Sequence, residues 1–229
     1  MPPTQKVKQT ANKNKRKDNR QMLSFNKECK NPIELRTDSK LPYLMFDVNM
    51  PVENILQEIS QAQDNFYNHR EDQSKGWSSL VMHGQGDEFT NAPMFYDIQE
   101  EDAVFDWTNA SNSIPSLKQW LLEQNYFIDF DRIRIMSVAP GGYIESHRDY
   151  DKSRLGPINI AINNPEGCEF VMEDVGVVPF KQNKGAWLDL SNKHSVRNNS
   201  NEHRYHIILH GGKTTEFKKQ AYENYRKLI

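Results

Sequence analysis

Apolar and polar residues alternate through most of the second half of the chain, and this period of two predicts β-strands. The predicted strands span residues 132–139, 143–149, 157–163, 168–173, 185–190, 194–198 and 204–210. Turn-forming residues separate them at Gly141–Gly142 and at residues 164–167 and 198–201. Two more strands are predicted nearer the N-terminus, at residues 41–47 and 77–82.

Apolar residues at helical spacing predict three helices. Pro51 begins the first, in which Val52, Ile55 and Ile59 form one apolar stripe. The second spans residues 114–122, with Pro115 in its first turn. The third spans residues 214–229, and one of its faces carries Phe217, Ala221, Tyr225 and Leu228. Helices followed by about seven closely spaced strands predict a mainly β fold with flanking helices, a double-stranded β-helix of the jelly-roll or cupin-like barrel type.

The alternation also predicts which side chains face the inside of this barrel. If Arg204 points inward, His206 and His210 do so too, whereas Tyr205, Ile207 and Leu209 point outward. In the strand at residues 157–163, Asn159 lies on the face opposite to the isoleucines. If His147 points inward, the alternation brings Tyr143, Glu145 and Asp149 inward as well. A polar interior with an apolar exterior is expected of a barrel that encloses a site.

Composition agrees with one modest domain. The chain has 229 residues, 36% of them hydrophobic, and a formal net charge of −2, which predicts no general attraction to nucleic acid or membrane. Cys29 and Cys168 cannot form a disulfide framework, and two cysteines suit a reducing compartment, so we expect a cytoplasmic protein. The sequence shows neither a membrane-length apolar run nor a signal-peptide core, so no membrane association is expected.

The N-terminus differs from the rest in charge. Residues 1–20 contain seven basic residues and one acidic residue, a net charge of +6, with almost nothing apolar to bury. We expect residues 1–38 to form a basic, flexible segment and residues 39–229 to form the barrel domain with its helices. A solvated tail is the simpler interpretation of this arm, and a tether to nucleic acid or another acidic partner is the alternative.

The candidate chemistry centres on His147, Asp149 and His194. A His-x-Asp triplet carries little information alone, but on a strand residues i and i+2 share a face, so His147 and Asp149 can bind one ion. His194 begins another predicted strand. Two imidazoles and one carboxylate fill one face of an octahedral Fe(II) and leave the opposite face open for a chelating co-substrate and dioxygen. We therefore expect these three residues to be the metal ligands and the catalytic centre.

Arg204 adds a second signal, since its planar guanidinium suits a carboxylate such as that of 2-oxoglutarate. If Arg204 does not bind this carboxylate, Arg134 or Arg154 is the alternative.

His147-Arg148-Asp149 also matches the catalytic loop of protein kinases. That loop needs an Asn where this chain has Arg154, and the other sequence motifs of protein kinases are missing. The residue types thus point to an iron-dependent oxygenase.

The stretch from Trp77 to Gly211 resembles the aspartyl/asparaginyl β-hydroxylases, a family of Fe(II)/2-oxoglutarate-dependent dioxygenases. The likeness includes Pro140–Gly141, His147, the segment from Gly185 to Leu190, and the spacing of ten residues from His194 to Arg204. It implies that His147 and His194 ligate Fe(II), that Arg204 binds the 5-carboxylate of 2-oxoglutarate, and that Asn159 lies near this co-substrate. Asp149 departs from the animal enzymes, which carry no carboxylate there, and matches the branch that includes free-proline hydroxylases.

The resemblance implies hydroxylation of an amino-acid side chain with dioxygen, releasing succinate and CO2. The substrate is either a protein-bound residue of the Asp/Asn type or a free amino acid such as proline. The same chemistry on another small molecule or on nucleic acid, and a non-catalytic metal-binding cupin, remain as alternatives. We expect a monomer or weak dimer. His206 is a further candidate for contact with the co-substrate. Arg148 and Arg154 are candidates for binding a substrate carboxylate, and Trp77 and His83 for the substrate mouth.

Overall fold

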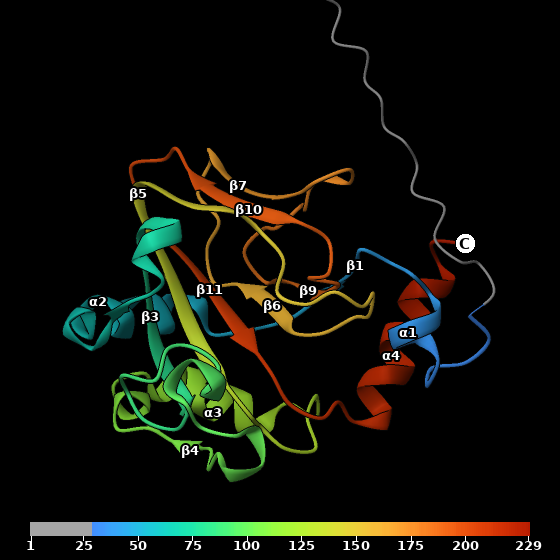
Figure 1. Cartoon of the computed structure of the whole chain (residues 1–229), viewed down its shortest axis with the longest axis horizontal. Helices are drawn as coiled ribbons and strands as arrows, with labels where there is room; N and C mark the ends of the chain where they lie inside the picture. Colours follow the sequence, from blue (N-terminus) through green and yellow to red (C-terminus); the bar gives the residue numbers. More distant parts are fainter. Residues whose placement is uncertain (1–28) are drawn as a thin grey trace, which may run out of the picture.

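The computed structural model describes residues 29–229, in which short helices precede and follow a large curled β-sheet (Figure 1). The strands are β1 Tyr43–Asp47, β2 Tyr67–Asn68, β3 Ser74–Gly84, β4 Asp106–Trp107, β5 Ile133–His147, β6 Ile158–Ala161, β7 Cys168–Met172, β8 Gly176–Val177, β9 Lys184–Leu188, β10 His194–Asn198 and β11 Arg204–Leu209. The α-helices are α1 Leu35–Asp38, α2 Val52–Gln61, α3 Pro115–Glu123 and α4 Thr215–Arg226. Short 3-10 turns lie at Gln63–Asn65, Glu71–Gln73, Pro93–Tyr96, Glu100–Asp102 and Ala110–Ser113.

The strand order shows a double-stranded β-helix, as the sequence predicts. Neighbouring strands follow the order β1-β9-β6-β11-β5-β10-β7-β8, and every named pair is antiparallel. The first part of β5 pairs with β11 and its last part pairs with β10, so this strand belongs to two layers. Figure 1 shows β7 and β10 in one layer and β6, β9 and β11 in the other.

Two glycines allow β5 to pass from one layer to the other. Gly141 has a φ of +68°, which L-residues rarely adopt. A Cβ on Gly142 would lie 2.7 Å from the carbonyl oxygens of both Ala139 and Lys75, so only glycine fits this close approach. The pair that the sequence marks as a turn is therefore a bend inside one long strand.

The two faces of the larger layer build two separate apolar clusters. The outer face packs against the helices and forms one cluster with them. The strands contribute Ile133, Ile135, Ile158, Ile160, Ile207 and Leu209 to this cluster, and the helices contribute Ile55, Leu117 and Phe217. The interior cluster lies between the layers and includes Trp77, Met136, Val138, Ala161, Phe170, Met172, Phe180 and Val196. The predicted outward direction of Ile207 and Leu209, and the common face of Ile158 and Ile160, are thus confirmed.

The predicted alternation is wrong at the end of β5. Tyr143 and Glu145 are exposed, whereas Ile144 is buried in the interior cluster. The register between β5 and β10 shifts next to His194, which marks a β-bulge. A bulge inserts one residue and resets the alternation, so Ile144 and His147 both face inward although they are three residues apart.

The helices and the N-terminal boundary differ from expectation in two places. Leu228 lies beyond α4 and is 56% exposed, so it does not share the buried face of Phe217, Ala221 and Tyr225. Within the segment expected to be flexible, Cys29 and Leu35 are buried in the outer cluster. The packed region therefore begins before residue 39, and the basic arm at residues 1–28 lies outside the described residues. None of the helices that the structure describes is long and apolar enough to cross a membrane.

Candidate metal centre

Two strand ends, the last residues of β5 and the first residue of β10, bring together the residues of the candidate metal centre. His147 ends β5 and His194 begins β10, and the two residues are direct partners in the antiparallel pair. Asp149 follows two residues after β5, where its backbone N–H donates to the carbonyl oxygen of Leu190 at 3.1 Å. The sequence therefore forms this group by strand pairing and one fixed turn.

The ligand atoms of His147, Asp149 and His194 all lie within 4.8 Å of one another. The two imidazole rings are 4.4 Å apart between centroids, and His147 Nε2 lies 3.5 Å from Asp149 Oδ1. Two imidazole nitrogens and one carboxylate oxygen at this separation could hold one divalent ion. Three protein ligands leave the remaining positions of a six-coordinate ion free for other ligands.

Backbone carbonyls fix the orientation of both imidazole rings. His147 Nδ1 lies 2.8 Å from the carbonyl oxygen of Glu145, and His194 Nδ1 lies 3.0 Å from that of Asn192. A carbonyl only accepts, so in the neutral form of each ring Nδ1 carries the proton and Nε2 is left with a lone pair. The second ring nitrogen of a metal-binding histidine is usually held in this way. The donor set and its orientation fit a metal ion.

The charges in this group support one another. Burial raises the pKa of Asp149, but His147, whose Nε2 lies 3.5 Å from the carboxylate, and the nearby charge of His194 outweigh it and lower the pKa to about 2. The nearby carboxylate of Asp149 raises the pKa of His147, whereas burial lowers that of His194. The carboxylate is therefore ionised at neutral pH, as a metal ligand must be.

Arg204 is a buried cation without an acidic partner. It is 2% exposed, and its hydrogen bonds go to Asn164 Oδ1 at 3.3 Å and to His206 Nδ1 at 2.9 Å. No carboxylate of the described residues forms an ion pair with it. Burial lowers its pKa to about 9, so the guanidinium stays charged at neutral pH. An unpaired buried charge is costly, and an anion in this place would compensate it.

His206 and Asn159 complete the surroundings of Arg204. Both are buried, and His206 Nδ1 lies 2.8 Å from the side-chain amide of Asn159. Burial and the charge of Arg204 lower the pKa of His206 well below 6.5, so the ring is neutral. Arg204 can only donate, so His206 Nδ1 accepts from it. The atom of Asn159 nearest to this nitrogen is the acceptor Oδ1, and turning the amide so that its NH2 group faces Nδ1 removes the conflict. The three predicted co-substrate residues therefore form one hydrogen-bonded cluster.

Asn164 belongs to this cluster and was missed in the sequence. Its Oδ1 lies 3.3 Å from both Arg204 Nε and His206 Nε2. In the sequence, Asn164 stands in an Asn-Pro-Glu-Gly run, which reads as an ordinary turn. Only the pairing of β6 with β11 brings the end of this turn toward Arg204.

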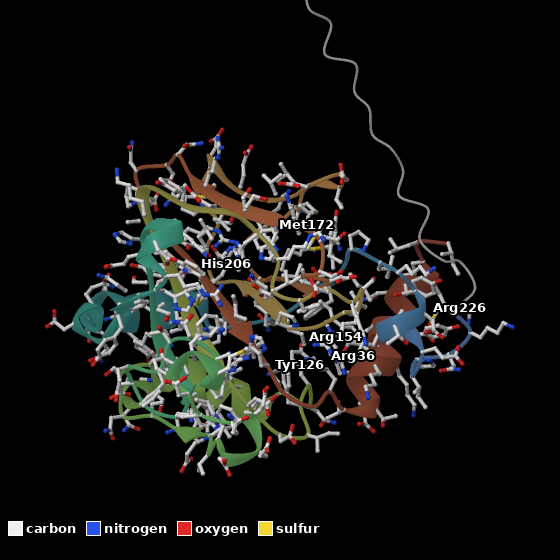
Figure 2. All side chains as sticks on the ribbon, in the orientation of Figure 1. Arg36, Tyr126, Arg154, Met172, His206 and Arg226 are labelled. Carbon is white, nitrogen blue, oxygen red and sulfur yellow. The ribbon has the colours of Figure 1, made fainter. Side chains whose placement is uncertain are left out.

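Aromatic side chains connect the metal-ligand residues with the Arg204 cluster. Phe170 stacks on His194 with ring centroids 5.4 Å apart, and Phe180 meets His206 edge-on at 4.7 Å. Phe170 and Phe180 contact each other at 5.7 Å. Figure 2 shows His206 and Met172 among the side chains between the two layers. This apolar lining keeps the dielectric constant low around the charged groups.

The other sequence candidates lie in different places. Arg148 is exposed, and Arg154 stacks over the ring of Tyr150 on the side where Figure 2 labels Arg36. Arg36 is held there by a hydrogen bond to the backbone of Leu155. The structure therefore does not bring Arg154 into the interior.

The two candidates for the substrate mouth are both buried. His83 Nδ1 bonds to the backbone of Asp131 at 3.0 Å, and the ring packs against Trp107, which places it in the wall of the fold. Trp77 lies in the interior cluster beside His69, with ring centroids 4.1 Å apart. Only Trp77 thus faces the space that contains the metal-ligand residues.

Comparison with known proteins gives one family match. A model described as aspartyl/asparaginyl beta-hydroxylase matches residues 47–212, which include the metal-ligand residues and the Arg204 cluster. A search of curated proteins found no significant match. Similar solved structures include a viral collagen prolyl hydroxylase from Paramecium Bursaria Chlorella virus-1 in complex with 2OG, with 12% identity, 74% of this chain and 95% of that chain covered, and a TM-score of 0.41.

Two further structures show the same level of likeness. A Pseudomonas putida prolyl-4-hydroxylase has 14% identity, covers 79% of this chain and 96% of its own, and gives a TM-score of 0.43. A 2OG-Fe(II) oxygenase family oxidoreductase from Burkholderia pseudomallei has 12% identity, covers 78% and 86%, and gives a TM-score of 0.44.

Proposed function

Since the chain belongs to the aspartyl/asparaginyl β-hydroxylase family, we propose that it is an Fe(II)- and 2-oxoglutarate-dependent dioxygenase that hydroxylates an amino-acid side chain. The observation that carries this proposal is the group of His147, Asp149 and His194, with both Nε2 atoms left available by backbone hydrogen bonds. Bound Fe(II) and 2-oxoglutarate supply the oxidation of a substrate C–H bond by dioxygen, with release of succinate and CO2.

His147, Asp149 and His194 would hold the iron. The ionised carboxylate of Asp149 offsets part of the positive charge of the ion. The Nδ1–H groups of His147 and His194 stay on backbone carbonyls, so the rings do not have to rotate when the metal binds. This orientation lowers the entropic cost of assembling the centre.

Arg204 would hold the distal carboxylate of 2-oxoglutarate. Its guanidinium is charged, buried and without a carboxylate partner among the described residues. Neutral His206 accepts a hydrogen bond from Arg204 and restricts its rotation, and the Asn159 and Asn164 side chains lie beside it. A guanidinium held in this way binds a carboxylate with little loss of entropy.

Phe170 and Phe180 would exclude water from the space between the metal-ligand residues and Arg204. Exclusion of water strengthens the interaction of Arg204 with a carboxylate and protects reactive species from solvent. A non-catalytic metal-binding cupin would have no use for a buried unpaired arginine in this position. The Arg204 cluster therefore favours the oxygenase over that alternative.

The substrate is proposed as an amino acid, either free, such as proline, or part of a peptide as an Asp or Asn residue. Succinate release should be measured with Fe(II), 2-oxoglutarate and dioxygen across a panel of free amino acids, Asp- and Asn-containing peptides and oligonucleotides. An amino acid or peptide should stimulate release above the level without substrate. Stimulation by oligonucleotides alone would contradict the amino-acid substrate, and His194→Ala is the control for metal-dependent turnover.

A further inference from the structure

A second set of buried polar groups lies on the interior face of β3 and β5. Among the described residues, four buried side-chain atoms lack a hydrogen-bond partner: His69 Nδ1, Trp77 Nε1, Ser79 Oγ and Arg134 Nε. Native proteins leave few such atoms unsatisfied, and each one calls for an explanation. We call these four residues the β3–β5 wall.

The strand register places these groups on one face. Ser79 is opposite Met136, and Trp77 is opposite Val138. Met136 and Val138 belong to the interior cluster, and Arg134 precedes Met136 by two residues on the same strand. Directly paired residues and residues two apart share a face of a sheet.

His69 joins the same wall from the neighbouring segment. Its ring packs against Trp77 at 4.1 Å, and its backbone N–H donates to the carbonyl oxygen of Trp77. Trp77 shares the interior cluster with Phe170, which stacks on His194 at 5.4 Å, so the wall and the metal-ligand residues line the same interior space. No ion pair joins Asp149 to Arg134.

Arg134 is the second buried cation without an acidic partner in the described part of the chain. It is 7% exposed, and its one hydrogen bond runs from Nη1 to the backbone carbonyl of Thr90. Burial, followed by the charge of Arg132, lowers its pKa to about 9, so it remains positive at neutral pH. Arg70 adds further positive charge. The wall therefore carries positive charge that no described acidic side chain pairs with.

The two buried arginines are separate sites. Arg204 is opposite Val138, four residues along β5 from Arg134, a distance of about 13 Å along a strand. Their guanidinium groups also have different partners, Asn164 and His206 for Arg204 and the Thr90 backbone for Arg134. One arginine is therefore left over when the other binds the co-substrate.

We infer that the β3–β5 wall binds a carboxylate group of a small-molecule substrate, with Arg134, Trp77 and Ser79 as hydrogen-bond donors. The inference rests on the proposed function, in which Arg204 is already taken by 2-oxoglutarate. An ionised carboxylate only accepts hydrogen bonds, and the unsatisfied N–H groups of Arg134 and Trp77 and the hydroxyl of Ser79 can all donate. Because these side chains are buried, the wall suits a small acid and orients it next to the metal.

Trifluoroacetate is a suitable probe, because it carries a carboxylate and its CF3 group can be followed by ¹⁹F NMR. The full chain is loaded with Mn(II) and saturating 2-oxoglutarate, so that the Arg204 site is filled. Paramagnetic Mn(II) then broadens the ¹⁹F signal of any probe that binds close to the metal. The same titration is made with Arg134→Met, Trp77→Phe and, as a matched surface control, Arg197→Met on the exposed side of β10.

We expect saturable broadening with the unchanged protein and with Arg197→Met. Arg134→Met should weaken probe binding about tenfold or more, because a charge-assisted hydrogen bond is lost. Trp77→Phe keeps the ring packing and removes one donor, so it should weaken binding less, and thermal melting of each variant shows that it is folded. This second variant keeps the test decisive if Arg134→Met does not fold.

Three results would overturn the inference and leave the oxygenase standing. The first is equal broadening with Arg134→Met, which would mean that the probe binds the metal directly or elsewhere. The second is loss of 2-oxoglutarate binding in Arg134→Met but not in Arg204→Leu, which would exchange the roles of the two arginines. Absence of broadening in a protein that does bind Mn(II) and 2-oxoglutarate also refutes the wall. Failure of the unchanged protein to bind both would refute the proposed function itself.

Discussion

At the scale of single residues, His147 and His194 each donate one ring N–H to the backbone, and this fixes which nitrogen can bind a metal ion. Substitution of His194 tests the metal site better than substitution of His147. His194 is buried, and it is the first residue of β10, so its replacement leaves the rest of the strand in place. His194→Ala should lower the affinity for Fe(II) or Mn(II) by about 100-fold or more. The neighbouring exposed variant Lys193→Ala should bind metal normally.

Asp149→Gly should weaken metal binding less than His194→Ala, since animal members of the family resemble this chain without a carboxylate at that position. Metal content after gel filtration and titration calorimetry with Mn(II) measure both effects. Full metal content in His194→Ala would contradict the assignment of the three ligands.

Arg204 allows a prediction for the co-substrate. Arg204→Leu removes one partner of a buried charge pair, a change that costs roughly 2–5 kcal/mol, so 2-oxoglutarate should bind about 100-fold more weakly or worse. Metal binding should be unchanged. The exposed variant Arg197→Leu serves as the control, and an unchanged 2-oxoglutarate titration in Arg204→Leu would mean that another basic residue holds the distal carboxylate.

The sequence was informative about residues whose chemistry is rare and less informative about residues whose role depends on packing. His147, Asp149 and His194 have a recognisable ligand pattern, and the structure brings them together. Asn164 and His69 have no such pattern. The role of Asn164 follows from its contact with Arg204, and that of His69 from its contact with Trp77, and both contacts are formed only in the folded chain.

At the scale of elements, β5 connects the two layers and places His147 beside β10. The period of two predicted the strands, the outward direction of Ile207 and Leu209, and the common face of Ile158 and Ile160. It could not predict the bulge next to His194, because residues 145–149 are all polar and give no apolar alternation in which a change of phase could be seen. For this reason the predicted inward direction of Tyr143 and Glu145 was wrong.

The bend in β5 gives a prediction for stability. In Gly142→Ala the new Cβ meets two backbone carbonyl oxygens at 2.7 Å, so the backbone must move and the melting temperature should fall clearly. Gly141→Ala has open space around its Cβ and pays only for its left-handed backbone, about 1–2 kcal/mol. Thermal denaturation should rank Gly142→Ala below Gly141→Ala, and the reverse order would contradict the close approach at Gly142.

At the scale of the whole molecule, the N-terminal part of the described chain is tied to its C-terminal helix. Figure 1 shows α1 beside α4, and the Tyr222 hydroxyl donates to the carbonyl oxygen of Cys29 at 3.2 Å. The sequence could not predict this contact, because residues 29–38 carry few apolar residues and no clear period. Burial of Cys29 and Leu35 comes from tertiary packing alone.

The contact defines where the chain can be shortened. Removal of residues 1–28 should leave metal-dependent decarboxylation of 2-oxoglutarate unchanged, because the candidate centre lies entirely in the described domain. Removal of residues 1–30 deletes buried Cys29 as well and should lower the melting temperature. Loss of turnover in the protein that lacks only residues 1–28 would show that the basic arm contributes to the site.

The central claim is that one molecule of this protein assembles an iron centre that 2-oxoglutarate chelates while Arg204 holds its far end. Fe(II) chelated by a 2-oxo acid absorbs visible light through charge transfer, so an anaerobic titration of the Fe(II)-loaded protein with 2-oxoglutarate follows this assembly directly. We expect a saturable band in the unchanged protein, no band in His194→Ala, and a band in Arg204→Leu that requires about 100-fold more 2-oxoglutarate. Absence of the band in the unchanged protein would contradict the proposed iron centre. A titration curve in either variant that equals that of the unchanged protein would do so as well.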